Sequence, residues 1–131
     1  GVLLAVKKAL RNVTIEINRK KQLEESIWVV TGSKKKIRLG MIYAPHESRT
    51  KKEDLKKMYK RMKEEIKEAK DKNQKIIIMG DLNCKVGKKI EGNIEEITKG
   101  GRMLLDLLEN EKLNLVNTSE KCEGKWTRQL K

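Results

Sequence analysis

Four apolar residues run into a polar turn in the stretch Ile76-Ile77-Ile78-Met79-Gly80-Asp81-Leu82-Asn83. A short apolar run followed by a glycine is typical of a strand. Because no polar residue interrupts the run, it predicts a central strand that is covered on both faces. Gly80 allows the chain to turn out of the sheet. The sequence therefore predicts that Asp81 and Asn83 lie at a water-accessible rim.

Asp81 and Asn83 are residue types that could act on a phosphate ester. If the chain stays extended, alternation places both side chains on the same side and Leu82 on the other. An aspartate there could orient and deprotonate a water, and an asparagine could donate a hydrogen bond to a phosphate oxygen. The alternative is an Asx-turn, in which both residues only cap the backbone. For this short motif taken alone, the turn is the more frequent outcome.

A helix is predicted from Thr50 to Lys72, immediately before this strand. Thr50 and Glu53 match the Thr-x-x-Glu capping box. One face of the helix is apolar at helical spacing, and it consists of Leu55, Met58, Tyr59, Met62, Ile66 and Ala69. A strand, a long helix and a second apolar strand predict a crossover unit with the helix packed on one face of a sheet.

Short strands and a second helix complete the prediction. Alternation and β-branched residues predict strands at 13–17, 27–30 and 37–43, joined as antiparallel hairpins. Pro45 prevents simple continuation of the third. Further along, the sequence predicts a long and therefore functional loop over 84–100, a helix over 102–111, and strands at 113–116 and 125–127.

Tyr43, His46 and Trp126 are further candidate contacts. Tyr43 ends a predicted strand and could hold a phosphate, although a tyrosine there more often closes the core. His46 is the only histidine, and we expect it to be a solvent-facing loop residue and not part of a catalytic triad. Trp126 and Thr127 stand between basic residues, an arrangement that suits nucleic-acid contact, whereas a tryptophan is more often part of a core.

The charge of the chain points to a polyanionic partner. The 131 residues include 32 Lys plus Arg and 19 Asp plus Glu, for a formal net charge of +13. Nucleic acid is the first candidate; a lysine-rich solubilised surface is the alternative. No apolar run approaches the roughly 20 residues of a membrane-spanning helix. Cys84 and Cys122 make neither a disulfide framework nor a zinc site, which favours an intracellular compartment.

Together these motifs resemble the endonuclease/exonuclease/phosphatase superfamily, and more narrowly the endonuclease domain of non-LTR (LINE-type) retrotransposons. The resemblance extends over nearly the whole chain. It is carried by Ile42-Tyr43-Ala44-Pro45, the helix, Gly80-Asp81-Leu82-Asn83, Val86-Gly87, Gly101-Arg102-Met103-Leu104-Leu105-Asp106, Leu115-Val116-Asn117-Thr118 and Trp126-Thr127. The spacing and order of several motifs make it more specific than a lone Gly-Asp-x-Asn.

The resemblance implies an α/β (α+β) fold, a four-layer α/β/β/α sandwich of the DNase I-like type. It implies a hydrolase that nicks DNA with Mg²⁺ or Mn²⁺ and works beside a reverse transcriptase in a nuclear polyprotein. By that resemblance Asp81 would activate water, Asn83 would help hold the site and Tyr43 would touch the scissile phosphate. Trp126, Thr127 and His46 would contact nucleic acid, although the family usually has asparagine at the position of His46.

The resemblance also implies that residues 1–131 are one partial domain, truncated at both ends. The family's metal-binding glutamate would precede Gly1, and its closing Asp-His pair would follow Lys131. We therefore expect the isolated chain to be inactive or nearly so, and to self-associate through uncovered apolar surface. Two other functions stay open, a catalytically inactive nucleic-acid-binding remnant and a phosphatase of the same superfamily.

Overall fold

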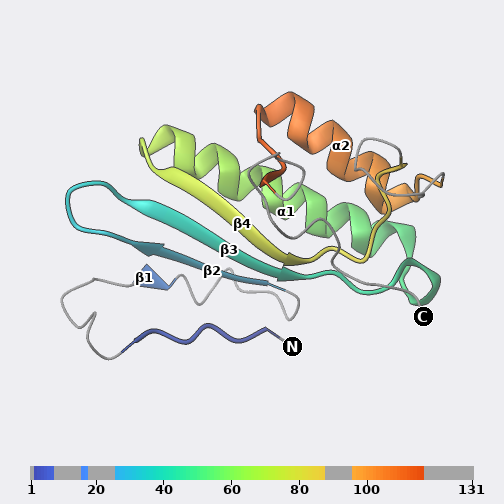
Figure 1. The fold of residues 1–131 in the computed structure, drawn as a ribbon, viewed down its shortest axis with the longest axis horizontal. Helices are drawn as coiled ribbons and strands as arrows, with labels where there is room; N and C mark the ends of the chain where they lie inside the picture. The colour runs from blue at the N-terminus through green and yellow to red at the C-terminus, as the bar shows by residue number, and fades with distance from the viewer. Residues whose placement is uncertain (1, 8–15, 18–25, 88–95, 117–131) are drawn as a thin grey trace. The chain divides into compact units, whose positions relative to one another are not determined.

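A computed structural model describes residues 2–7, 16–17, 26–87 and 96–116 of the chain (Figure 1). These residues fall into two compact units, Gly1–Asn83 and Cys84–Lys131. The first unit contains the sheet and the longer helix, and the second contains the shorter helix. Each unit has its own internal structure, and whether the two form a single domain stays a prediction.

The first unit is built on a four-stranded sheet with the order β1-β2-β3-β4. The strands are β1 (Glu16–Ile17), β2 (Ser26–Thr31), β3 (Ile37–Tyr43) and β4 (Lys75–Asp81). The β2–β3 pair is antiparallel and the β3–β4 pair is parallel. Gly32 follows β2 with a φ of 103°, which suits the turn predicted there. The predicted hairpin and its neighbouring parallel strand are therefore confirmed.

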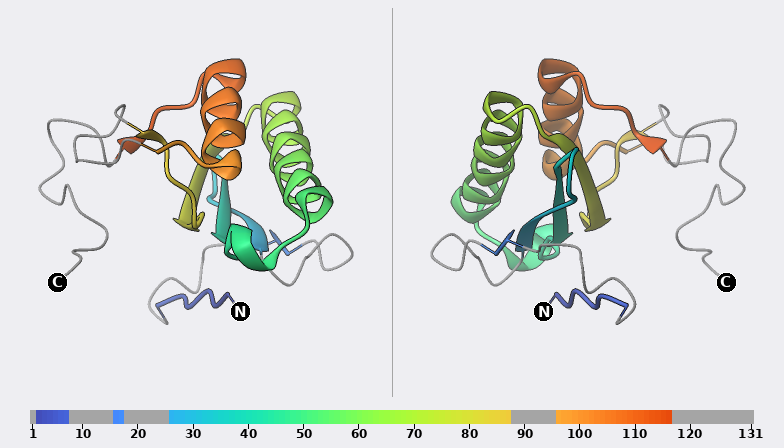
Figure 2. Two further views of the ribbon diagram at one scale, coloured as in Figure 1. Left: turned by 90° about the vertical axis from the view of Figure 1, so that its right-hand side faces the viewer. Right: turned by 90° about the vertical axis from the view of Figure 1, so that its left-hand side faces the viewer.

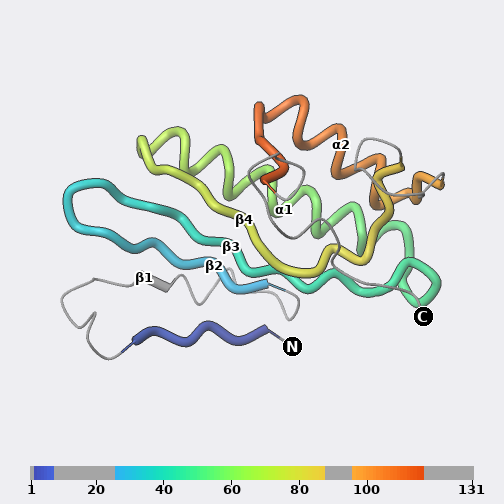
Figure 3. The backbone as a smooth tube through the Cα atoms, in the orientation of Figure 1, coloured from blue at the N-terminus to red at the C-terminus, as the bar shows by residue number. Residues whose placement is uncertain are grey.

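The crossover between the parallel strands is also confirmed, and Figure 3 follows its path from β3 through the helix to β4. A 3-10 turn, η3 (Glu47–Arg49), leads into α1 (Lys52–Asp71). The predicted capping box is wrong. Lys51 is the N-cap and makes no side-chain capping bond. The hydroxyl of Thr50 instead donates to the carbonyl of His46 at 3.1 Å, so it completes the preceding turn.

Helix α1 lies over one face of the sheet, which we call the covered face (Figure 2). The strand register places Trp28, Arg38, Gly40 and Ile42 on this face, and all four are buried. The Trp28 ring lies over Gly40 so closely that a Cβ added at Gly40 would come within 2.4 Å of it. The buried side of α1 consists of Leu55, Met58, Tyr59, Met62, Glu65, Ile66 and Ala69. It matches the predicted apolar face, with Glu65 added.

The opposite face, which we call the open face, is exposed towards β4. Ile77 and Met79 are 47% and 48% exposed, and Tyr43 on β3 is 47% exposed. Within the described part of the chain β4 is the edge strand of the sheet. The prediction of a central strand covered on both faces is therefore wrong for these residues. An uninterrupted apolar run cannot distinguish a covered strand from one with an exposed face.

The second unit is organised around α2 (Lys99–Glu111). The Thr98 side chain accepts a hydrogen bond from the Gly101 N–H at 3.2 Å and caps the helix. Lys112 ends it in the left-handed conformation. A single bridge joins Val86 to Ile97. The predicted helix at 102–111 is thus confirmed, three residues longer at its start, but residues 113–116 are described without a strand. The predicted strand at 125–127 lies outside the described residues.

The described residues therefore form a mixed α+β structure with one sheet and two helices. A second sheet facing the first is not found among them. None of the helices in the described ranges has the length and apolar character needed to cross a membrane.

Candidate functional site

The carboxyl ends of β3 and β4 bring Tyr43 and Asp81 together. These two residues are direct register partners in the parallel pair. Neighbouring strands lie about 5 Å apart, so the two backbones are adjacent although the residues are far apart in sequence. Both side chains are exposed. We call Tyr43, Asp81 and Asn83 the strand-end site.

Asp81, Leu82 and Asn83 form an Asx-turn. The backbone N–H of Asn83 donates to Oδ1 of Asp81 at 2.9 Å. Asn83 has a φ of 43°, in the left-handed region that asparagine tolerates better than most residues. The chain is not extended here, and the strand alternation used to place Asp81 and Asn83 on one side is wrong. The turn that the sequence left open as the alternative is the one observed.

The turn nonetheless ties the two strand ends together around Ala44, which is fully buried. The Ala44 N–H donates to the backbone carbonyl of Asp81 at 2.8 Å. The Asn83 side-chain amide donates to the Ala44 carbonyl at 2.7 Å. Both backbone groups of Ala44 are therefore paired with the β4 exit. Asn83 fixes where Asp81 lies relative to Tyr43, through a bond to Ala44 that the sequence did not reveal.

A glycine is required at position 80, directly before the last residue of β4. Its φ is 134°, a backbone conformation that residues other than glycine rarely adopt. A Cβ added at Gly80 would come within 1.8 Å of the Ile42 carbonyl oxygen. The prediction that Gly80 turns the chain out of the sheet is wrong, because β4 continues through Asp81 and Gly80 pairs with Ile42. The close approach of β3 is the reason for a glycine here.

The strand-end site offers a few polar groups for chemistry. One oxygen of Asp81 is engaged in the Asx-turn, and the exposed carboxylate has a second oxygen that can accept a hydrogen bond from water. The Tyr43 hydroxyl can donate to a phosphate oxygen, and the Asn83 amide retains one further N–H. These groups can bind and orient a phosphate ester and a water, which is the chemistry that the sequence suggested for them.

The described residues do not make up a complete metal site. Among residues 2–7, 16–17, 26–87 and 96–116, no group of three or more His, Cys, Asp or Glu side chains is placed to hold a metal ion. Mg²⁺ is commonly held by one or two carboxylates plus substrate phosphates in an octahedral shell. The strand ends supply the single carboxylate of Asp81 and the amide of Asn83. We therefore derive no chemical step through a metal.

The remaining candidate residues lie elsewhere or outside the described part. His46 is exposed, and its Nδ1 lies 2.9 Å from the Ser48 hydroxyl and caps η3. This confirms the prediction of a loop histidine and leaves its contact with nucleic acid untested. Trp126, Thr127 and Cys122 lie outside the described residues. Cys84 is of intermediate exposure and forms no disulfide with another described residue.

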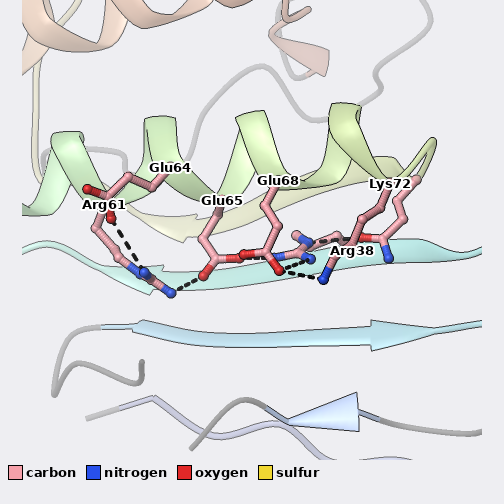
Figure 4. Close-up of polar contacts among 7 residues, drawn as sticks. Arg38, Arg61, Glu64, Glu65, Glu68 and Lys72 are labelled. Atoms are coloured by element: carbon pink, nitrogen blue, oxygen red, sulfur yellow. Dashed lines mark hydrogen bonds and ion pairs between the residues drawn. The ribbon is translucent and has the colours of Figure 1, made fainter. Parts of the chain in front are cut away.

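A buried cluster of charges, which the sequence analysis missed, joins α1 to β3 (Figure 4). Arg38 forms ion pairs with Glu65 and, at 3.1 Å, with Glu68, and its Nε donates to Gln74 at 3.0 Å. Arg61 pairs with the other oxygen of Glu65. Glu65 is 2% exposed. The signal available in the sequence was Glu65 itself, a charged residue on the otherwise apolar side of α1.

Burial alone would lower the pKa of Arg38, but its hydrogen bonds to Glu68 and Glu65 and their charges outweigh burial and raise it. A raised folded-state pKa stabilises the fold at every pH below the unfolded-state pKa, and this is lost only as pH rises through the folded-state pKa. For arginine that window is strongly alkaline. The contribution of Arg38 is therefore constant around neutral pH.

Comparison of the chain with protein-family models, with curated proteins and with solved structures gives no match. The geometry of the strand-end site, the charge of the chain and the sequence resemblance are therefore the grounds for a function.

Proposed function

We propose that the strand-end site is part of a phosphodiesterase site that acts on DNA, in a partial endonuclease domain of the retrotransposon type. The observation that carries the proposal is the direct register of Tyr43 and Asp81, fixed by the hydrogen bond from Asn83 to Ala44. The net charge of +13 supports a nucleic-acid substrate. The proposal also includes three features that the resemblance implies: a four-layer sandwich, a Mg²⁺ or Mn²⁺ cofactor, and a reverse transcriptase in the same nuclear polyprotein.

In this proposal each residue has a defined role. The free carboxylate oxygen of Asp81 accepts a proton from a water whose oxygen attacks phosphorus, and the sugar oxygen on the opposite side leaves and takes a proton from solvent. The Tyr43 hydroxyl donates to a non-bridging phosphate oxygen. Asn83 positions Asp81 through its bond to Ala44. The strand-end site supplies a single carboxylate from the described residues, so we expect the chain by itself to bind DNA and to cut it little.

Binding at the strand ends can be tested by NMR on the labelled chain titrated with a short DNA duplex at low salt. We expect shifts at the backbone amides of Tyr43, Asp81 and Asn83 that are absent with a neutral polymer of similar size. Shifts that leave these three amides unchanged would overturn the proposed site.

Catalysis can be tested by nicking of supercoiled plasmid with Mg²⁺ or Mn²⁺. The matched variants are Asp81→Asn, which retains an acceptor for the Asx-turn, and Glu109→Gln, an exposed carboxylate on α2 that changes the net charge equally. Any nicking should be lost in Asp81→Asn and retained in Glu109→Gln. Nicking that survives Asp81→Asn would exclude Asp81 as the base. Robust nicking by the wild-type chain would contradict the expected inactivity but not the site.

A nucleic-acid-binding remnant without catalysis is the second candidate. It is favoured by the single carboxylate at the strand ends, because phosphoryl transfer normally requires more charge stabilisation than one carboxylate and a phenol provide. A remnant would bind DNA equally well with and without the Asp81→Asn substitution and would never cut it. A phosphatase of the same superfamily would instead release phosphate from a phosphoinositide and leave DNA intact.

A further inference from the structure

Helix α1 has a second property that is unrelated to its packing on the sheet. At about 100° per residue, every position within an arc of about 80° is a lysine. These positions are Lys52, Lys56, Lys60, Lys63, Lys67 and Lys70. All six are exposed. We call them the lysine stripe, and at about 1.5 Å per residue it runs for about 27 Å along the helix.

The acidic residues of α1 are kept off the lysine stripe. By the same helical angles, Glu53, Asp54, Glu64, Glu65, Glu68 and Asp71 lie on the buried side or on the other exposed flank. Ion pairs of α1 concentrate on that flank, such as Lys57 with Asp54 at 3.3 Å. At the edge of the stripe Lys67 pairs with Asp71. Four stripe residues, Lys52, Lys56, Lys60 and Lys63, have no ion pair with another described residue.

A helix needs lysines for solubility, but solubility does not require them to be separated from the acids. Mixed Glu and Lys at i,i+4 spacing would stabilise the helix further. A flank with six like charges lacks part of this stabilisation. The neighbouring stripe lysines are three or four residues apart, so their charges recur about every 5 to 6 Å along a straight line. Each strand of duplex nucleic acid carries a regular row of opposite charges, with one phosphate per about 3.4 Å of helix axis.

We propose that the lysine stripe is a binding surface for the phosphate backbone of duplex nucleic acid. The proposal takes its partner class from the proposed function, but it concerns a different surface and requires no catalysis. Lysine binds phosphate as a point charge, so a row of lysines tracks the backbone without reading sequence. The stripe would hold a duplex against the outside of α1 independently of the strand-end site.

Two other partner classes fit the stripe less well. An amphipathic helix that binds a membrane inserts its apolar side, but that side of α1 is packed on the sheet, with Ile66 and Ala69 fully buried. Protein interfaces depend on aromatic or arginine anchors, and the stripe presents lysine alone. A polyanion with regularly spaced charges remains the best match.

The test compares two triple variants of the full chain that lose the same net charge. Lys56→Gln/Lys60→Gln/Lys63→Gln neutralises the middle of the stripe. Lys34→Gln/Lys35→Gln/Lys99→Gln neutralises exposed lysines elsewhere. Affinity for a duplex of about 20 base pairs is measured against salt concentration in EDTA, so that cleavage plays no part, and circular dichroism verifies that α1 is retained.

The stripe variant should bind at least tenfold more weakly at low salt, and the slope of log affinity against log salt should fall by about 2 to 3, since each lost phosphate contact removes about 0.9. The matched control should change the slope by less than about 1. Equal losses in both variants would mean that net charge, and not the stripe, binds the duplex. An unchanged stripe variant would also overturn the proposal, as would stripe-dependent binding to phosphatidylserine vesicles without binding to DNA. The assay contains no divalent metal and follows binding alone, so a failed nicking experiment leaves the result interpretable.

Discussion

The two faces of the sheet have similar apolar strand sequences and different surroundings. On the covered face, α1 buries Trp28 and Ile42 to 3% and 2% exposure and encloses the Arg38–Glu65 ion pair. On the open face, Ile77 and Met79 remain about half exposed. An apolar side chain contributes to folding in proportion to the area it removes from water. The open face also buries Val29 and Met41, so its surface available for association is the part at β4.

The largest expected effect is on the covered face, at Arg38. In Arg38→Met, Glu65 would keep Arg61 but lose its other buried partner, and we expect the free energy of unfolding to fall by about 3 to 5 kcal/mol. Chemical denaturation followed by circular dichroism measures this. Adding Glu65→Met should restore part of the loss, because the second change removes the buried charge. A single variant as stable as wild type would contradict the argument.

The next effect compares one isoleucine from each face. Ile42→Ala should lower the free energy of unfolding by about 2 to 5 kcal/mol, since it leaves a cavity under α1. Ile77→Ala, which removes the same atoms, should lower it by about 1 kcal/mol, because about half of that side chain is already in water. Similar losses in the two variants would show that something covers Ile77 in solution.

The smallest effect on stability is expected on the open face, where the effect on association is larger. Ile77→Ser with Met79→Ser should lower the free energy of unfolding by about 1 to 2 kcal/mol, because about half of each side chain is already in water. If the exposed apolar residues drive self-association, the double variant should sediment as a monomer at concentrations where the wild-type chain does not. A wild-type chain that is monomeric throughout would refute self-association.

Local patterns predicted the elements of this fold well. The apolar spacing of α1, the turn at Gly32 and the apolar run of β4 each depend on neighbours in sequence, and each element is present. The capping box failed because the Thr50 hydroxyl has a closer acceptor at His46 in the 3-10 turn. The strand expected at 113–116 failed because four apolar-rich residues cannot specify a pairing partner.

The candidate site was only partly predictable. Tyr43 and Asp81 were recognised individually, and the parallel crossover was enough to expect their strand ends to meet. The sequence could not distinguish the Asx-turn at Asn83 from an extended chain, because both conformations use the same residue types. The role of Ala44 was not detectable, because its contribution comes only from its backbone groups.

The two hydrogen bonds to the backbone of Ala44 have a consequence for folding kinetics. The bond from Asn83 to Ala44 links residues 39 apart in the chain, so it forms only after the crossover has been laid down and a long loop has been closed. No local fragment of the chain can hold Tyr43 and Asp81 in register. Hydrogen exchange at the Ala44 amide should therefore occur through opening of the whole β3–α1–β4 unit. Its rate would measure how often the strand-end site opens.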